Sequence, residues 1–172
     1  YLQRSGGIFK DMLIHDFDIF RWILGEEAET VYATASALTD PAIASEANDA
    51  DTTAVTIRTV HGKLAQIHTS RRAAYGYDQR FEVLGSKGML QAGNHRPTEV
   101  VASGPDVVSI DKPEHFFLQR YEKAYRIELD HFIAVLDGQE KLRVSIEDGV
   151  KALELADAAT TSWREGRIVR LR

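Results

Sequence analysis

The sequence contains no cysteine, which excludes disulfides, thiolate metal sites and a cysteine nucleophile. It also lacks the run of about 20 apolar residues that a bilayer-spanning helix needs. A secretory signal has a basic segment followed by an apolar one, and no such pair of segments is present. Positive charge is scarce, because 21 Lys and Arg face 26 Asp and Glu and the basic residues are dispersed. We therefore expect a cytoplasmic protein that binds neither a membrane nor nucleic acid.

Motifs that bind the phosphates of nucleotides are also missing. Neither G-x-G-x-x-G nor G-x-x-x-x-G-K-[ST] occurs. The "GSKG" at residues 85–88 lies between two expected strands, so it is predicted to be a turn and not a phosphate cradle at the start of a helix. The chain begins with Tyr1 instead of methionine and reaches a helix almost at once. We therefore expect a piece of a longer polypeptide.

The apolar residues that are present follow the periods of helices and strands. The chain has 172 residues, 44% of them hydrophobic, which is enough for the core of one domain. Spacings of three and four predict a helix that ends at Gly25, a second from residue 117 to Gly138, and a third from Ser145 to Gly166. In the third, Ser145 and Asp148 form a capping box.

Alternating and β-branched residues predict antiparallel strands. The expected strands are residues 29–38, 52–60, 63–72, 80–84, 88–91, 98–102, 107–110 and 167–171. The dipeptide His61-Gly62 predicts a hairpin with a two-residue turn, and residues 39–51 are predicted to be a loop. The resulting fold class is α+β, with one large, mostly antiparallel β-sheet and helices packed on one face. Its other face would expose apolar side chains, so we expect a homo-oligomer formed through that face.

Asp11 and His15 are the candidate catalytic residues. Residues four apart lie one above the other on a helix, so this pair shares a face. The pair could be a solvated surface contact, but the apolar residues around it predict burial, and buried ionisable groups are often functional. An aspartate beside a histidine orients the imidazole for taking a proton from a hydroxyl. Asp18 lies on the same face and could accept a hydrogen bond from a substrate, or else cap the helix or pair with Arg21.

Four segments carry a family resemblance. They are "SGGIFKDMLIHDFDIFRWILG" (5–25), "SRRAAYGYDQRFEVLGSKGML" (70–90), "FFLQRYEKAYRIELDHFIAVLDG" (116–138) and "SIEDGVKALELADAATTSWREGRIVRL" (145–171). Spread over the whole chain and in family order, they resemble the C-terminal half of the Gfo/Idh/MocA dehydrogenases. The combination of "YGYDQR" with "DMLIHDFD" is similar to the members that oxidise inositol.

The resemblance implies an NAD-dependent enzyme of two domains. Its N-terminal Rossmann half would bind NAD, and residues 1–172 would be the single substrate-binding and oligomerisation domain. By motif position, His15 matches the histidine that deprotonates the substrate hydroxyl as hydride leaves the same carbon, and Asp11 matches the aspartate that assists it. Tyr77 matches a tyrosine that contacts the polyol, and Tyr75 is expected to do so from beside it. The implied reaction is oxidation of a secondary hydroxyl of myo-inositol to the ketone.

Other assignments stay open at this point. Tyr75 and Tyr77 could instead pack at a strand end with their hydroxyls in water. In the family a lysine from the Rossmann half completes the site, but Lys112 in "DKPEH" lacks the matching context and receives no role. The histidines outside the motif are expected to be structural: His61, His68, His95, His115 and His131.

Three alternative functions remain. The substrate could be another polyol or an aldose, such as scyllo-inositol or a glucose-type sugar. A metal hydrolase would use Asp11 and His15 as ligands, but no third ligand and no H-E-x-x-H motif is present, so no metal site is expected. A non-catalytic module for dimerisation or polyol binding would describe the isolated fragment.

Overall fold

The computed structural model describes residues 1–171 as two compact units. The first unit comprises residues 1–72 and 143–171, and the second comprises residues 73–142. No cis peptide bond occurs in the described chain. The predicted α+β class is confirmed, because antiparallel strands and helices make up both units.

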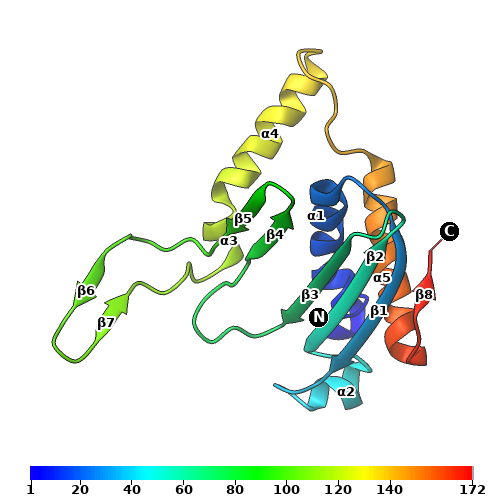
Figure 1. The fold of residues 1–172 in the computed structure, drawn as a ribbon, viewed down its shortest axis with the longest axis horizontal. Helices are drawn as coiled ribbons and strands as arrows, with labels where there is room; N and C mark the ends of the chain where they lie inside the picture. The colour runs from blue at the N-terminus through cyan, green and yellow to red at the C-terminus, as the bar shows by residue number, and fades with distance from the viewer. Residues whose placement is uncertain (172) are drawn as a thin grey trace. The chain divides into compact units, whose positions relative to one another are not determined.

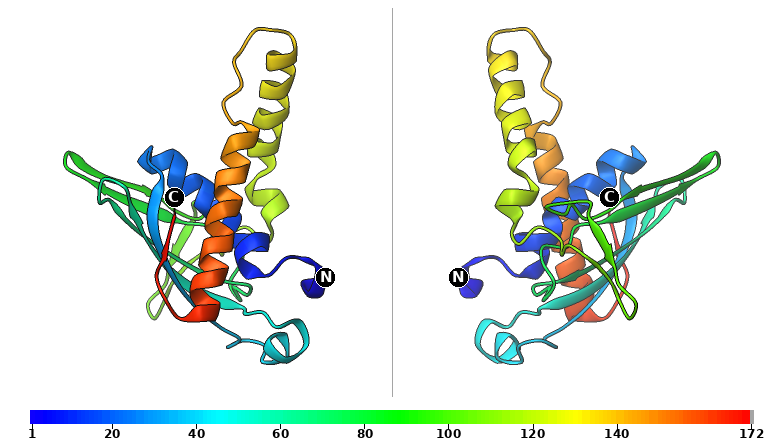
Figure 2. Two further views of the ribbon diagram at one scale, coloured as in Figure 1. Left: turned by 90° about the vertical axis from the view of Figure 1, so that its right-hand side faces the viewer. Right: turned by 90° about the vertical axis from the view of Figure 1, so that its left-hand side faces the viewer.

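The first unit is a four-stranded sheet with helices on one face (Figure 1). The strands run in the order β3-β2-β1-β8, and every neighbouring pair is antiparallel. Helices α1 and α5 lie side by side against the sheet (Figure 2). The elements are the 3-10 turn η1 (Leu2–Arg4), the π-helical η2 (Phe9–Leu13), α1 (Ile14–Leu24), β1 (Ala28–Ser36), α2 (Ala42–Ala47), β2 (Thr52–Thr59), β3 (Leu64–Ser70), α5 (Ile146–Glu165) and β8 (Val169–Arg170).

The core lies between the sheet and the two helices. Strand β2 buries every second residue, as a strand with one covered face must. Helix α1 contributes aromatic rings to this layer, whereas α5 contributes mostly alanines, which let its backbone approach the sheet closely. The core residues include Ile8, Leu13, Phe17, Val31, Val55, Ile57, Leu155, Ala156 and Ala159.

Ser162 links α5 to the backbone of β1. Its buried Oγ accepts a hydrogen bond from the Ala33 N–H at 2.9 Å and donates one to the Arg167 carbonyl at 2.6 Å. At the other end of α5, Ser145 and Asp148 form the predicted capping box. Even this 20-residue helix lacks the apolar stretch that a membrane span would need, and so does every other described helix.

The open face of the four-stranded sheet is polar, contrary to our expectation. Most side chains there belong to threonine, serine, glutamine, histidine and arginine, with Tyr32, Ala54 and Leu64 as the exceptions. Exposed apolar side chains are instead frequent in the second unit, for example Leu84, Leu90, Leu129 and Phe132. Exposed apolar surface is therefore more frequent in the second unit than on this sheet face.

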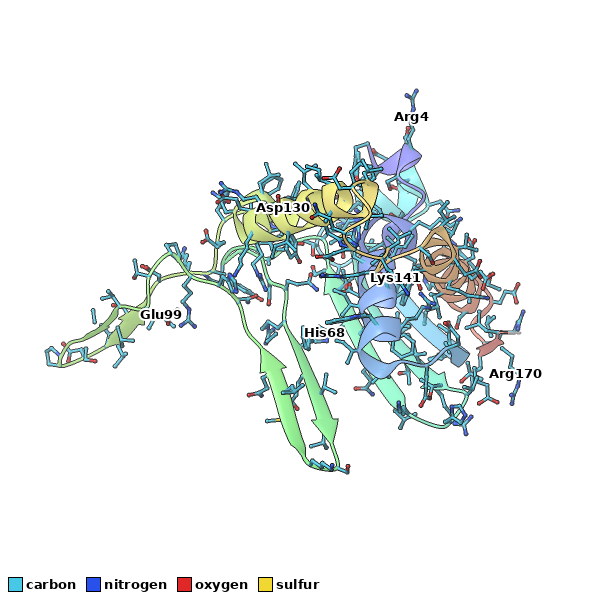
Figure 3. The ribbon with its side chains drawn as sticks, turned by 90° about the horizontal axis from the view of Figure 1, so that it is seen from above. Arg4, His68, Glu99, Asp130, Lys141 and Arg170 are labelled. Carbon is cyan, nitrogen blue, oxygen red and sulfur yellow. The ribbon has the colours of Figure 1, made fainter. Side chains whose placement is uncertain are left out.

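The second unit contains two hairpins and a helical segment. Strands β4 (Phe81–Gly85) and β5 (Gly88–Ala92) form one two-stranded sheet, and β6 (Val101–Ser103) and β7 (Val108–Ile110) form another. The predicted helix is divided at Tyr121 into α3 (Phe117–Arg120) and α4 (Glu122–Leu136). None of the residues of α4 is buried, and Asp130 is one of its exposed residues (Figure 3). The strands thus form three sheets and not the one large sheet that we expected.

Three local predictions were wrong. Residues 39–51 contain the short helix α2, which begins after Pro41, where the ring fixes a helical φ. The β2–β3 turn has three residues, because the Thr59 N–H bonds the Lys63 carbonyl and Gly62 takes the left-handed φ of 89° that the extra residue requires. The first helix starts as the π-helical η2, so Asp11 and His15 belong to different helix types.

Asp51 organises the loop between β1 and β2. Its carboxylate is buried and accepts hydrogen bonds from the N–H groups of Leu38, Thr39 and Asp40 at 2.8–2.9 Å and from the Thr52 hydroxyl at 2.7 Å. Burial raises the pKa of this carboxyl, but the hydrogen bonds outweigh it and lower the pKa from 3.8 to about 2. The folded pKa is thus below the unfolded value, so ionised Asp51 stabilises the fold above about pH 4 and loses this effect as the pH falls toward 2.

We expect Asp51→Asn to lower the free energy of unfolding by about 3 kcal/mol at pH 7, because an amide cannot accept all four hydrogen bonds. The difference from the wild type should shrink by about 1 kcal/mol at pH 3, where the unfolded carboxyl is largely protonated. Urea unfolding at both pH values measures this. Asp106→Asn, at an exposed position, is the matched control. A pH-independent difference would contradict the role of the charge.

Candidate active site

The helix that carries Asp11 and His15 lies in the first unit, against the core. Ile8, Phe9 and Leu13 are buried, and they anchor the π-helical turn, while Asp11 projects from the opposite side with a small exposed fraction. The helix ends, as predicted, at Gly25, whose φ of 61° gives the left-handed C-cap. Single π-helical turns are frequent at functional sites.

Asp11 pairs with an arginine and not with the histidine four residues later. Arg71 Nη1 donates to Asp11 Oδ2 at 2.7 Å, and the Tyr1 hydroxyl donates to Asp11 Oδ1. The bond to Asp11 contributes to a raised pKa of the Tyr1 hydroxyl. A permanently charged guanidinium forms a stronger hydrogen bond with a carboxylate than a neutral imidazole does. The predicted Asp11–His15 contact is therefore replaced in this chain by the Asp11–Arg71 ion pair.

His15 is exposed at the start of α1. Within residues 1–171 its ring makes no hydrogen bond and no ion pair. The predicted burial of this imidazole was wrong, because the apolar face of the helix is formed by Leu13, Phe17 and Phe20 and the imidazole lies outside it. An exposed, unpaired imidazole is accessible to a substrate.

Asp18 lies near Arg21, and pairing with Arg21 was one of the alternative roles that the sequence predicted for it. The Arg21 Nη1 to Asp18 Oδ1 distance is 3.7 Å, and Arg21 bonds more closely to Glu27 at 2.7 Å and to Asp148 at 3.2 Å. The hydrogen bond and charge of Glu27 are the main reasons why the pKa of Arg21 is raised. Arg21 thereby joins α1 to the first turn of α5.

The "YGYDQR" motif forms a loop at the beginning of the second unit. Asp78 accepts hydrogen bonds from Arg80 Nε and Asn94 Nδ2, both at 2.7 Å, and from the Tyr75 hydroxyl. Burial raises the pKa of Asp78, but Arg80, Tyr75 and Asn94 together lower it to about 2. The bond to Asp78 raises the pKa of the Tyr75 phenol. Asp78 therefore holds Tyr75 and the loop in a fixed arrangement.

Tyr77 differs from Tyr75 in its packing. It is half-buried, its N–H donates to the Glu114 carbonyl at 2.8 Å, and its ring meets Tyr121 edge-on with centroids 5.7 Å apart. Its hydroxyl makes no hydrogen bond within residues 1–171. The ring is thus fixed while the phenol stays available to a ligand.

The remaining histidines do not form a metal site. His131 Nδ1 lies 3.0 Å from Glu140, and His61 Nδ1 lies 3.5 Å from Glu26. His68 is exposed on β3 (Figure 3). Across the described chain no group of three or more His, Asp or Glu side chains is arranged to hold a metal ion.

The residues that the structure describes include no Rossmann-type turn for the phosphates of a dinucleotide. Phosphate binding of the Rossmann type needs a glycine-rich turn between a strand and a helix. Gly6 and Gly7 precede a helix, but the 3-10 turn η1 comes before them and not a strand. Residues 1–171 therefore offer no such site for the pyrophosphate.

Sequence comparison places the chain among oxidoreductases. Residues 2–171 match the C-terminal alpha/beta domain of the oxidoreductase family Gfo/Idh/MocA. The chain is 48% identical to inositol 2-dehydrogenase of Rhizobium meliloti over 167 residues, which cover 97% of this chain and 50% of that protein. The chain thus spans about half the length of the curated relatives it matches.

Solved structures agree with this match. The myo-inositol dehydrogenase of Corynebacterium glutamicum superposes with a TM-score of 0.93 at 44% identity, over all of this chain and 51% of that one. The scyllo-inositol dehydrogenase of Lactobacillus casei, solved with NAD(H) and scyllo-inositol, superposes with a TM-score of 0.88 at 28% identity, over 97% of this chain and 49% of that one.

Proposed function

Since this chain belongs to the Gfo/Idh/MocA oxidoreductase family, we propose that the whole protein oxidises a secondary hydroxyl of myo-inositol to the ketone. NAD would accept the hydride from the reacting carbon, and a base would take the hydroxyl proton. The observation that carries this proposal within the chain is the first helix, which presents an accessible imidazole at His15 one turn after the fixed carboxylate of Asp11.

The proposed roles follow the chemistry of each side chain. His15 removes the proton from the hydroxyl, and Asp11 binds the polyol and assists the histidine. Tyr77 and Tyr75 contact the other hydroxyls of the substrate from their loop. Asp18 is proposed as a further acceptor, although its pairing with Arg21 competes with this role.

We propose that NAD binds to an N-terminal Rossmann domain outside this chain. The relatives are about twice as long, and residues 1–171 lack a glycine-rich strand–turn–helix. The 172 residues would then supply the substrate site, and the other domain would supply the cofactor and the remaining substrate contacts.

The test is an assay of the protein expressed from its complete reading frame. We expect NADH formation with myo-inositol, and 2-keto-myo-inositol as the product identified by mass spectrometry. Heat-inactivated protein and reactions without NAD are the controls. Failure to oxidise any inositol would overturn the proposed substrate, and failure to reduce NAD with any polyol would overturn the dehydrogenase itself.

Scyllo-inositol and aldoses are the second candidate substrates. The similarity to a scyllo-inositol dehydrogenase structure supports the first of these. An enzyme discriminates between stereoisomers of a polyol because the wrong isomer leaves buried polar groups of the binding site without a hydrogen-bond partner. A panel of myo-inositol, scyllo-inositol and glucose, compared by kcat/KM, separates the candidates. Activity confined to glucose would exclude inositol as the substrate.

We propose that the protein is a homo-oligomer in which the sheet of β4 and β5 packs against another copy. Leu84 is 83% exposed in this sheet, and exposed apolar groups of this kind are typical of interfaces. We expect Leu84→Glu to lower the mass measured by light scattering, since a charge is costly to bury. Leu38→Glu, at a position 72% exposed in the first unit, is the control. An unchanged mass would contradict this interface.

A further inference from the structure

Arg71 bridges two carboxylates beside the candidate active site. It follows β3 directly, and its Nη1 lies 2.7 Å from Asp11 Oδ2 while its Nη2 lies 3.0 Å from Asp49 Oδ2. The side chains of Arg71, Asp11 and Asp49 are only 13%, 12% and 5% exposed. The bridge is therefore shielded from water, and removal of the guanidinium would leave two largely buried carboxylates without their cation.

The guanidinium of Arg71 is itself fixed by the backbone. Arg71 Nε donates to the Ala50 carbonyl at 3.3 Å, and the Arg71 N–H donates to the Asp51 carbonyl at 2.8 Å. Both acceptors belong to the segment that leads into β2. These two bonds hold Arg71 next to the start of β2 without any contribution from Asp11.

Asp49 extends the bridge to the first turn of the helix. Its Oδ1 accepts a hydrogen bond from the Ile8 N–H at 3.0 Å, one of the donors that a helix start leaves unpaired. Gly7 permits this approach, because a Cβ there would lie 3.3 Å from Asp49 Oδ1 and its φ of 89° is left-handed. One cluster therefore fixes both the start of the helix and the carboxylate that the helix carries.

We propose that Arg71 is a positioning residue for Asp11, and that Asp49 holds Arg71 and the first helical turn in place for the same purpose. This inference rests on the proposed function, because it assigns Asp11 to the reaction. Arg71 holds Oδ2 of Asp11, so that the carboxylate keeps one orientation on the helix that also carries His15. The bridge acts on the substrate only through Asp11.

The test uses the protein from its complete reading frame, with Arg71→Gln, Arg71→Lys and the neighbouring Arg72→Gln as variants. We expect Arg71→Gln to lower kcat for the inositol substrate by about 30-fold, since misplacement of a reacting group by about 1 Å costs up to about 100-fold. Arg71→Lys keeps the cation but not the two-pronged geometry, so its kcat should lie between Arg71→Gln and the wild type. The KM for NAD should not change. Arg72 is exposed, and Arg72→Gln should match the wild type.

A double variant tests whether Arg71 acts through Asp11. If it does, Asp11→Asn combined with Arg71→Gln should be no slower than Asp11→Asn alone, because the effects of coupled residues do not add. Multiplied losses in the double variant would overturn the inference. A folded Arg71→Gln whose kcat lies within twofold of the wild type would also overturn the inference. If Arg71→Gln does not fold, a kcat of Arg71→Lys within twofold of the wild type would do the same. An inactive wild type would instead refute the proposed function, so the two failures are distinguishable.

Discussion

His15→Gln is expected to lower kcat for the oxidation of myo-inositol by about 1000-fold, the loss that removal of a general base typically causes. Glutamine fills a similar volume and can still form a hydrogen bond, but it cannot accept the hydroxyl proton at neutral pH. His15 is exposed and contributes nothing to the core, so the unfolding temperature should stay the same. Initial rates of NADH formation and thermal unfolding of the same preparations measure both effects.

His68→Gln is the matched control for His15→Gln. His68 is also exposed, lies on β3 of the same unit and has no expected role in the reaction. Its substitution should leave kcat within about twofold of the wild type, as for surface changes away from a site. In addition, His15→Ala should regain part of its activity with added imidazole, because the exposed position admits a small base. A fully active His15→Gln would remove this residue from the reaction.

Features with local signals could be predicted from the sequence. The capping box of Ser145 and Asp148 needs only residues three apart, and it was confirmed. Gly25 and Gly166 end their helices because each takes a left-handed φ near 60° that other residues avoid. The β2–β3 pair was found for the same reason, since the alternation of burial along both strands is visible within a few residues.

Features that depend on distant partners could not be predicted. Asp11 and Arg71 are 60 residues apart in the chain, and neither has a local signal that identifies the other. The spacing of Asp11 and His15 predicted a contact that a stronger, distant cation displaced. The sequence also did not predict that β4 and β5 form a two-stranded sheet of their own. The strands that join one sheet are decided by backbone hydrogen bonds between segments that are distant in the chain.

The loop with the candidate substrate tyrosines depends on Gly76, which lies between Tyr75 and Tyr77. Its φ of 136° is one that side chains rarely adopt, and a Cβ there would lie 2.8 Å from the Pro113 carbonyl oxygen and 3.1 Å from that of Glu114. The Glu114 carbonyl cannot move freely, since the Tyr77 N–H donates a hydrogen bond to it. The glycine therefore permits the close backbone approach that fixes the loop.

We expect Gly76→Ala to lower kcat/KM for inositol by about 100-fold. The added Cβ should shift the loop and its two tyrosines by about 1 Å, and a misplacement of that size costs about 100-fold. The KM for inositol should rise while the KM for NAD stays constant. Steady-state kinetics of the protein from its complete reading frame measures both. Tyr77→Phe, which removes only a hydroxyl, should show a smaller rise of the KM in the same direction.

Gly88→Ala separates the steric clash from backbone strain. Gly88 has a similar φ of 144°, but a Cβ there would meet nothing within 4 Å. Both variants carry the strain of an unfavourable φ, about 1–3 kcal/mol, and should lose similar stability from it. Only Gly76→Ala adds the contact with the Pro113 carbonyl, so only it should lose kcat/KM. Equal kinetic losses in the two variants would contradict the expectation that the contact with the Pro113 carbonyl causes the loss of kcat/KM.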